Sequence, residues 1–177
     1  MQKKKDELLD LVDDEGNIIG QEFRSVVYAR GMKNFRVVDI FIKNPDGKFF
    51  ICKRSSDKKI SPGKYESCGE HVNPGETDLQ AARRALQEEF GIDVPPLQFE
   101  FIGYTTPSDG ASGYSAVFQA TIDQQPILGR EHETGDWMSV FEIIAMLREN
   151  PRQFRSNILN HFAQHARVLF PESAGIV

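Results

Sequence analysis

The sequence predicts an α/β (α+β) domain: an α/β/α sandwich whose mixed β-sheet carries helices on both faces, preceded by an N-terminal β-hairpin extension. Two observations predict it. Short apolar runs bounded by turn residues occupy the first third of the chain and return in its middle. One amphipathic helical pattern separates these two groups, and two more close the chain. Hairpins first, a central helix and two final helices suit a sheet covered on both sides.

Length and charge narrow the class of protein. A chain of 177 residues can bury one sizeable core, so we expect a single domain over residues 1–177, with residues 1–7 as a flexible tail. The formal net charge of -5 argues against a general binder of nucleic acid polymers, which would need a basic surface. The lysines at positions 3–5 precede acidic residues, and no apolar run is long enough to span a bilayer. We therefore expect a cytoplasmic protein without a membrane partner.

The first half of the chain is expected to form two hairpins. The expected elements are a hairpin within residues 8–23, a short helix or irregular connection over 24–32, strands over 36–44 and 48–54, and a strand over 65–68. The run Asp14 to Asn17 is the first turn, and Asn44 to Gly47 is the strongest hairpin signal in the chain. Dense β-branched and aromatic residues around the second turn predict the buried centre of the sheet.

A central helix is expected to begin at Thr77, because Thr77 and Gln80 form the Ser/Thr-x-x-Glu/Gln capping pattern. Gly91 supplies its end, since glycine readily adopts the left-handed conformation that terminates helices. The apolar residues that predict its core-facing stripe are Leu79, Ala82, Leu86 and Phe90. The remaining faces are then expected to hold Arg84, Ala85, Glu88 and Glu89.

The second half is expected to add strands and two helices. The expected elements are strands over 97–105 and 114–122, a short strand at 137–138, a helix from 139 through 147, and a final helix opened by Asn150 and Pro151. Ser139 and Glu142 repeat the capping pattern. The final helix carries an apolar stripe of Phe154, Ile158, Phe162, Ala166 and Leu169. The polar loop 107–113 is a natural place for substrate selection.

The segment 69–92 holds the candidate chemistry. A glycine-rich loop leads into the central helix, from which Glu88 and Glu89 are expected to project away from the core. With the loop residue Glu76 they could converge on Mg²⁺ or Mn²⁺, which prefer oxygen ligands and keep waters for a phosphate-bearing substrate. Arg84 lies four residues before Glu88 and is placed to hold that carboxylate. The segment therefore predicts a metal-assisted phosphate site.

The same segment resembles the signature of the Nudix family, G-x5-E-x7-R-E-U-x-E-E-x-G-U, in which U is aliphatic. The matching residues are Glu76, Arg84, Leu86, Glu88, Glu89, Gly91 and Ile92. Two positions depart: Glu70 stands at the opening glycine, and Ala85 replaces the glutamate after Arg84. The resemblance covers residues 8–148 and is greatest to the isopentenyl-diphosphate-isomerase-like branch of Nudix hydrolases.

The resemblance implies a Nudix-type sandwich and a Mg²⁺- or Mn²⁺-dependent pyrophosphohydrolase. The implied substrate is a small molecule in which a nucleoside diphosphate is linked to another moiety. The implied metal ligands are Glu70, Glu76, Glu88 and Glu89, and the implied substrate contacts are Arg54 and Arg84. Dimers are common in the family, which makes a homodimer an expectation.

Ala85 raises the question of the general base. Some family members place a carboxylate at this position, and losing a general base typically lowers the rate by roughly a hundred- to ten-thousand-fold. Glu131 and Glu133 lie where many Nudix hydrolases supply a further carboxylate, and we prefer Glu133, although a solvated acidic loop is an equal alternative. The expected catalytic residues are therefore Glu88, Glu89 and Glu133.

Two other functions stay open. Ala85 and Glu70 favour a catalytically weak Nudix-fold protein that binds a nucleotide or diphosphate as a sensor. Isopentenyl diphosphate isomerase is the less favoured alternative, although His71 matches a metal-binding histidine of that family. The isomerase cysteine position falls on Gly69 rather than on its neighbour Cys68, and Phe35 stands where a second histidine is expected.

The remaining cysteines and histidines have ordinary interpretations. Cys52 and Cys68 are too sparse for a disulfide scaffold and are expected to be free thiols. His161 and His165 are four residues apart on the final helix and could face one metal. Phe162 stands where the zinc-protease pattern needs a glutamate, so we expect surface or boundary histidines.

Overall fold

The structure is a computed structural model and describes residues 6–171. In chain order its helices and strands are β1 Leu8–Val12, β2 Ile18–Phe23, α1 Arg24–Ala29, β3 Arg36–Lys43, β4 Phe49–Arg54, β5 Tyr65–Glu66, β6 Cys68–His71, α2 Asp78–Phe90, β7 Phe99–Thr105, β8 Tyr114–Thr121, β9 His132–Met138, α3 Val140–Glu149 and α4 Ser156–Leu169. Short 3₁₀ turns cover Pro96–Gln98, Pro107–Asp109 and Pro151–Gln153.

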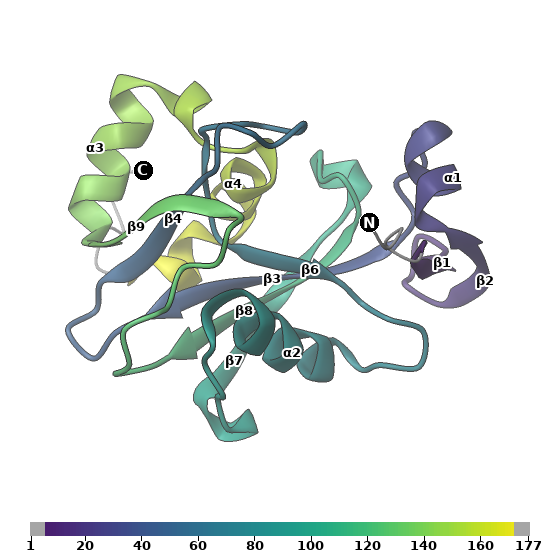
Figure 1. Ribbon diagram of the computed structural model, residues 1–177, viewed down its shortest axis with the longest axis horizontal. Helices are drawn as coiled ribbons and strands as arrows, with labels where there is room; N and C mark the ends of the chain where they lie inside the picture. The colour runs from purple at the N-terminus through teal and green to yellow at the C-terminus, as the bar shows by residue number, and fades with distance from the viewer. Residues whose placement is uncertain (1–5, 172–177) are drawn as a thin grey trace.

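β3 is the centre of a mixed sheet (Figure 1). One edge of β3 pairs with β8 in parallel, and β7 continues the sheet antiparallel to β8. The other edge changes partner along its length: residues 37–40 pair with β6, whereas Ile42 and Lys43 pair with β4. β4 pairs in turn with β5 and β9. The sheet therefore forks beside β3, between β6 and the strands grouped around β4.

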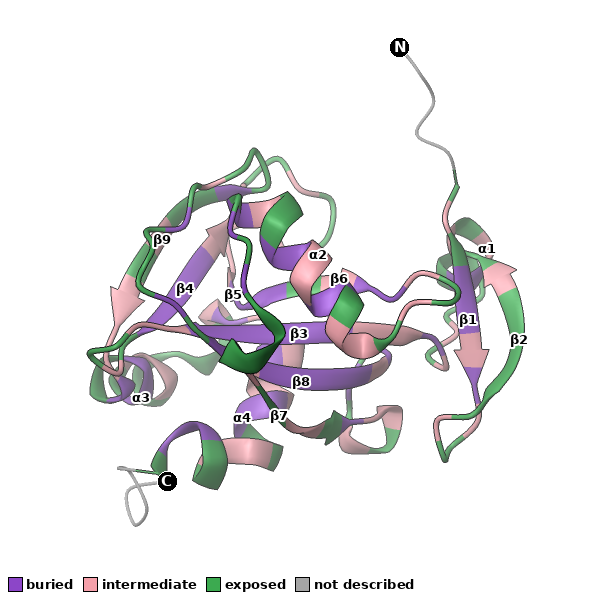
Figure 2. Ribbon diagram, turned by 90° about the horizontal axis from the view of Figure 1, so that it is seen from below, coloured by how far each residue is buried: buried purple, intermediate pink, exposed green. Residues whose placement is uncertain are grey.

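Helices cover both faces of the sheet (Figure 2). α2 lies on one face, over a buried cluster that includes Val38, Ile40 and Ile42 of β3. α3 and α4 lie on the other face, over a second cluster that includes Phe41. Successive side chains of a strand point to opposite faces, which is why neighbouring residues of β3 enter different clusters. The predicted sandwich with a mixed sheet is confirmed.

Helix α2 begins and ends where its sequence predicts. Thr77 accepts a hydrogen bond from the backbone N–H of Gln80, whose side chain accepts one from the backbone N–H of Thr77. Gly91 ends the helix with a φ of 67°. One expectation about its faces is wrong, because Ala85 is fully buried rather than on an outer face. Ala85 and the equally buried Ala81 lie one turn apart, so the buried arc is wider than the predicted stripe.

Two strands differ from their predicted ranges by more than one or two residues at an end or by being divided. The strand expected over 65–68 is divided at Ser67, because β5 pairs with β4 whereas β6 pairs with β3. β9 spans seven residues rather than the two expected at 137–138, since it pairs with β4 along its whole length. In both cases pairing between distant segments sets the strand boundary.

The start of the final helix also differs from the prediction. Asn150 caps a short 3₁₀ turn that begins at Pro151, and α4 begins only after Arg155. The backbone N–H of Arg155 donates to the carbonyl of Tyr65 at 2.9 Å, which draws this segment toward β5. No helix in the described part of the chain is both long and apolar enough to cross a membrane.

The N-terminal hairpin and α1 form a small unit at one end of the sheet (Figure 1). β1 and β2 pair antiparallel, and Leu9, Val27 and Phe35 make a separate buried cluster. Of the tail expected over 1–7, residues 1–5 lie outside the described part of the chain. The next two residues are anchored at the start of α1, Asp6 to Ser25 and Glu7 to Arg24.

Candidate functional site

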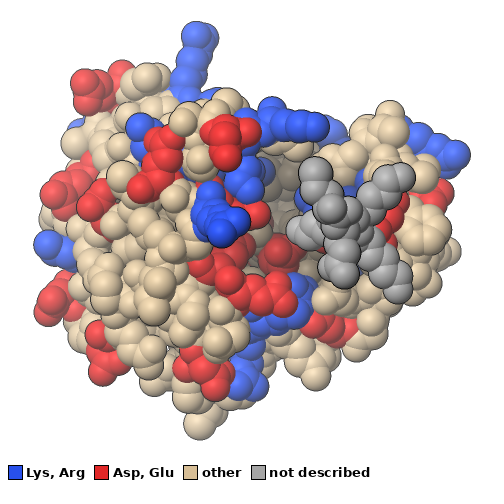
Figure 3. Space-filling model, viewed as in Figure 1, with Lys and Arg blue, Asp and Glu red and all other residues tan. Residues whose placement is uncertain are grey.

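A cavity of about 380 Å³ opens where the sheet forks between β6 and β4. Its lining comes from the N-terminal unit, from β3, β4 and β6, from the end of α2, from the segment before β9 and from the start of α4. Figure 3 shows a hollow in this face with acidic and basic side chains around it. Segments that are far apart in the sequence therefore meet at one site.

Four glutamates line part of this cavity, and we call them the acidic wall: Glu70, Glu88, Glu89 and Glu131. Glu70 comes from β6, Glu88 and Glu89 from the last turn of α2, and Glu131 from the segment before β9. The charges of Glu70 and Glu131 act directly on Glu89. Like charges this close disfavour full ionisation, so the wall carries an electrostatic cost that a cation would relieve.

Glu89 is the most enclosed member of the acidic wall, with 15% of its side chain exposed. Burial, followed by the charges of Glu66, Glu70 and Glu131, raises the pKa of Glu89 to about 8. A hydrogen bond with the thiol of Cys68 acts in the opposite direction. Near neutral pH this carboxyl is therefore largely protonated in the metal-free protein.

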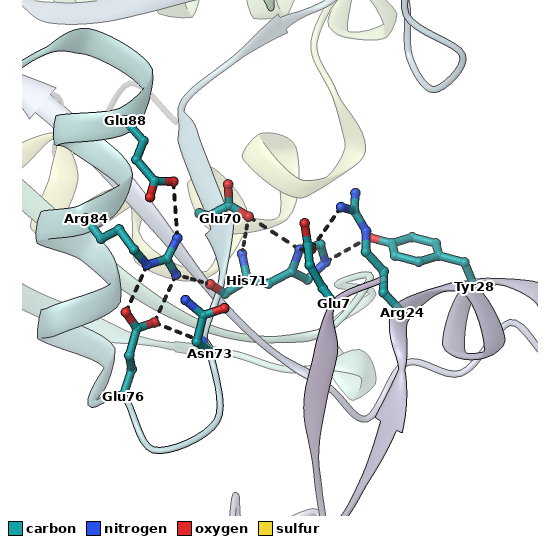
Figure 4. A network of polar contacts seen from close by, with 9 residues as sticks. All are labelled: Glu7, Arg24, Tyr28, Glu70, His71, Asn73, Glu76, Arg84 and Glu88. Carbon is teal, nitrogen blue, oxygen red and sulfur yellow. Dashed lines mark hydrogen bonds and ion pairs between the residues drawn. The ribbon is translucent and has the colours of Figure 1, made fainter. Parts of the chain in front are cut away.

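Arg84 of α2 binds the loop that connects β6 to α2 (Figure 4). Its guanidinium donates to both carboxylate oxygens of Glu76 at 2.9 Å, and Nη2 also donates to the carbonyl of His71 at 2.7 Å. Its Nη1 lies 3.4 Å from Oε2 of Glu88, and Glu76 also accepts from the backbone N–H of Asn73. Neither Arg84 nor Glu76 lines the cavity. Both act from behind the acidic wall, by fixing the loop and steadying Glu88.

His71 connects the acidic wall to the N-terminal unit (Figure 4). Its Nε2 shares a hydrogen bond with the hydroxyl of Tyr28 at 3.1 Å. Its Nδ1 lies 3.4 Å from Oε1 of Glu70 and 3.6 Å from Oε2 of Glu7. Burial raises the pKa of Glu70, but hydrogen bonds from His71 and the charge of Arg84 outweigh it and leave that pKa below its usual range. Glu70 is thus a fixed, ionised carboxylate.

Two arginines line a second part of the cavity, Arg54 at the end of β4 and Arg155 just before α4. Both bind Glu66 of β5, whose side chain is 6% exposed. Nη1 of Arg54 lies 2.9 and 3.1 Å from the two oxygens of Glu66, and Nη1 of Arg155 donates to Oε2 at 2.5 Å. Burial raises the pKa of Glu66, but His132 and the two arginines lower it by more, so the pKa lies below its usual range. We call these three residues, Arg54, Glu66 and Arg155, the arginine cluster.

A buried polar chain lies behind the cavity. Asp39 lines the cavity, accepts from the hydroxyl of Ser115 at 2.7 Å, and places Oδ2 3.0 Å from Nε2 of His161. His161 and His165 each lie 3.0 Å from the hydroxyl of Thr105. The expectation of a surface or boundary position is wrong for His161, which is fully buried because it faces a carboxylate inside the sandwich. The two histidines share a threonine.

The structure does not bring Glu133 to the cavity, which argues against the base role expected for it. Its carboxylate is exposed and accepts from the backbone N–H and the hydroxyl of Ser56, with Nζ of Lys53 3.9 Å away. Glu133 lies at the register shift in the pairing of β9 with β4, whereas Glu131 precedes the strand and lines the cavity. The cavity therefore favours Glu131 over Glu133 as the candidate for the general base.

Several cavity residues have no counterpart in the predicted set: Glu7, Tyr28, Asp39 and Arg155, together with Glu66 behind them. None belongs to a local motif. An acidic residue within an otherwise apolar strand was the available signal for Asp39, whereas the short run Tyr65 to Cys68 gives Glu66 no such signal. Arg155 offered no signal, because only the fold brings it to β5.

The donor chemistry of the cavity suits a hard divalent cation. The acidic wall offers carboxylate oxygens, which are the donors that Mg²⁺ and Mn²⁺ prefer. Burial, and after it the charges of the neighbouring carboxylates, raises the pKa of Glu89. As they lie, no three His, Cys, Asp or Glu side chains within residues 6–171 are grouped to hold a metal ion.

The sandwich, the capped helix and the carboxylates at signature spacing define a Nudix-type domain. The family described as "NUDIX domain" matches residues 33–162, and the chain belongs to this family, as predicted.

Known relatives agree with this assignment. An uncharacterized Nudix hydrolase of Nostoc sp. is 39% identical over 122 residues, which cover 68% of this chain and 72% of the relative. An isopentenyl-diphosphate Delta-isomerase of Serratia proteamaculans is 29% identical over 154 residues, 84% of this chain and 86% of the relative. The crystal structure of DR0079 from Deinococcus radiodurans matches with a TM-score of 0.80 at 25% identity, and covers 91% of this chain and 100% of that one.

Proposed function

We propose that this protein hydrolyses a diphosphate bond in a small molecule, a nucleoside diphosphate linked to another moiety, with Mg²⁺ or Mn²⁺. The observation that carries the proposal is the meeting of the acidic wall and the arginine cluster in one cavity. Nε2 of His132 lies between them, 3.4 Å from Glu66 and 3.9 Å from Glu89. A diphosphate needs both partners, a cation and guanidinium donors, for its oxygens.

Glu70, Glu88 and Glu89 are the residues that would hold the cation. When bound, a divalent cation neutralises diphosphate oxygens and makes a bound water more acidic. Glu76, expected from the signature to be a ligand, has both oxygens on Arg84 and serves to steady Glu88 through it. Arg84 has the same supporting role, rather than the substrate contact expected for it.

Glu131 is our assignment for the residue that accepts the proton of the attacking water. It lines the cavity and is held by Lys58, whose Nζ lies 2.8 Å from its carboxylate. A general base must reach the proton that it removes, and Glu133 does not line the cavity. Arg54 keeps the role of substrate contact, because it lines the cavity with its guanidinium fixed on Glu66.

A phosphate-release screen over nucleoside diphosphate derivatives, with Mg²⁺ and with Mn²⁺, tests the proposal. We expect metal-dependent release from at least one compound. Glu88→Gln and Glu89→Gln should each weaken Mn²⁺ binding in calorimetry, because each removes a carboxyl group that the cation would bind in its ionised form. Glu100→Gln, which changes an exposed glutamate on β7, is the matched control. Unchanged Mn²⁺ affinity in both α2 variants would refute the metal assignment.

A second candidate is a protein that binds a diphosphate compound without turning it over. Ala85 favours it, because a fully buried methyl group stands where some family members carry a carboxylate. Tight binding of a nucleoside diphosphate derivative, with no metal-dependent release, would support this candidate against the first.

The structure gives isomerase chemistry little support. Cys68 is 2% exposed, and burial raises the pKa of its thiol well above the usual value. A thiol held this way is a poor acid or nucleophile. A test is to supply isopentenyl diphosphate with Mg²⁺ or Mn²⁺, and we expect no isomerised product.

A further inference from the structure

The arginine cluster has a charge balance unlike that of an ordinary ion pair. Glu66 supplies one negative charge, and Arg54 and Arg155 supply two positive charges. The pKa of Glu66 lies below its usual range, so its carboxylate stays ionised. One positive charge is therefore left in excess on the cavity lining.

The fold holds Arg155 in place through its backbone as well as its side chain. Its N–H donates to the carbonyl of Tyr65 at 2.9 Å, and Phe154 forms a parallel bridge with Tyr65. The rings of Tyr65 and Phe154 lie 5.6 Å apart. Arg54 is fixed as well, since its Nε donates to the carbonyl of Ile60 at 3.2 Å. Side chains already ordered lose little entropy when they bind a ligand.

Both guanidinium groups keep donors for a ligand. A guanidinium carries five N–H donors in a planar fork that matches phosphate oxygens. Among the described residues, Arg155 makes hydrogen bonds through Nη1, and Arg54 through Nε and Nη1. Because both residues line the cavity, we infer that the rest of each fork is available to a ligand there.

We propose that Arg155 binds a phosphate group of the substrate, together with Arg54, and that Glu66 is the positioning residue that sets both arginines. The choice of phosphate as the ligand rests on the proposed function. We call Arg54 and Arg155 in this role the clamp. The clamp lies on the α4 side of the cavity, and His132 lies between it and the acidic wall. One phosphate of a diphosphate would then face the clamp while the other faces the acidic wall.

Binding of imidodiphosphate, a diphosphate analogue with a nitrogen bridge that resists hydrolysis, tests the clamp. Calorimetry is run at fixed Mg²⁺ on the full chain. Arg155→Gln should weaken the affinity on the order of tenfold, as expected for hydrogen bonds to a charged group. Arg155→Lys keeps the charge but loses the fork, and should fall between Arg155→Gln and the unaltered protein. Arg152→Gln, an exposed arginine on the preceding turn, should bind as the unaltered protein does.

Glu66→Asp separates positioning from charge. It keeps the negative charge but shortens the reach to both arginines, so affinity for imidodiphosphate should fall although the net charge is the same. Thermal unfolding shows whether the variant is folded, and a stability loss with unchanged affinity would overturn the positioning role. If Glu66→Asp fails to fold, the series of Arg155 variants decides alone.

The outcomes distinguish the clamp from the proposed hydrolase. Unchanged affinity in Arg155→Gln, or no binding of imidodiphosphate by the unaltered protein, would overturn the clamp. Metal-dependent hydrolysis that persists with an unchanged KM in Arg155→Gln would reject the clamp and leave the hydrolase. Binding that depends on Arg155, without any hydrolysis in the screen, would support the clamp and reject the hydrolase.

Discussion

The acidic wall and the arginine cluster border the same cavity, but the chain builds them in different ways. Three of the four glutamates of the acidic wall lie within residues 70–89, one on the strand β6 and two on the helix α2 that follows it. The arginine cluster joins residues 54, 66 and 155, which only the forked sheet and the start of α4 bring together. A charged site can thus be encoded by one local segment or by the topology alone.

The two regions also differ in electrostatic balance. In the acidic wall, burial and like charges raise the pKa of Glu89 to about 8. In the arginine cluster, His132 and two guanidinium groups hold the pKa of Glu66 below its usual range, although burial acts against them. A bound cation would reduce the repulsion within the acidic wall. The arginine cluster already contains its cations, and its excess positive charge favours an anion.

The largest expected effect is on kcat and concerns Glu131, the member of the acidic wall that lies outside residues 70–89. Glu131→Gln should lower kcat on the order of a hundred- to ten-thousand-fold, because it removes the assigned general base. Glu133→Gln is the matched control, two residues away and outside the cavity, and should leave kcat nearly unchanged. Steady-state kinetics on a substrate found in the screen measures both variants. The reverse ranking would return the base to Glu133.

The next effect concerns the pH dependence of stability without metal. The pKa of Glu89 is about 8 when folded and near 4.5 when unfolded, so between these values the folded state binds the extra proton. Stability from this group is therefore present below about pH 4.5 and is lost as pH rises toward 8, by at most on the order of 5 kcal/mol. Urea unfolding should show Glu89→Gln losing less stability than the unaltered protein across this window. Parallel pH profiles would contradict the raised pKa.

A smaller effect concerns Ala85, the buried residue of α2 that lies one turn before Glu88 and Glu89. Ala85→Glu restores the family carboxylate, but its side chain would enter a fully buried position under α2. Overpacking and burial of a carboxyl group should lower the free energy of unfolding by about 3 kcal/mol. Gln87→Glu adds the same group on an exposed position of the helix and should be nearly neutral. A stable Ala85→Glu with increased turnover would show instead that a carboxylate here reaches the cavity.

The sequence predicts the acidic wall better than the rest of the site, and the reason is physical. The cap at Thr77, the end at Gly91 and the spacing of Glu88 and Glu89 are local properties of a helix, which the structure reproduces. The burial of Ala85 is harder to predict from the sequence, because the width of the buried face of a helix depends on what packs against it. Helical spacing alone cannot supply that width.

The arginine cluster lies beyond such local reasoning. Arg155 reaches Glu66 because α4 begins after a 3₁₀ turn and the preceding residue pairs with Tyr65. Glu66 and Cys68 fall on different strands because the sheet forks at Ser67. These pairings join residues far apart in the chain, and no spacing in one sequence encodes them. The fold class could be predicted, whereas this part of the site could not.

The smallest effect tests the contact between β6 and the residue beneath it. Gly69 of β6 pairs with Asp39 of β3, and a methyl group on Gly69 would lie 2.8 Å from Oδ1 of Asp39. Ser115 and His161 hold that carboxylate, so it cannot move aside without weakening their contacts. Gly69→Ala should therefore lower the free energy of unfolding by about 1 to 2 kcal/mol in urea.

Gly20→Ala is the control for this last prediction, because the space around Gly20 is open and its strand accepts a side chain. Its unfolding free energy should stay close to that of the unaltered protein. Equal stability of the two variants would mean that Asp39 shifts freely. The carboxylate behind the cavity would then be as adaptable as the exposed Glu88, and the fixed geometry assigned to the region around the arginine cluster would not extend to Asp39.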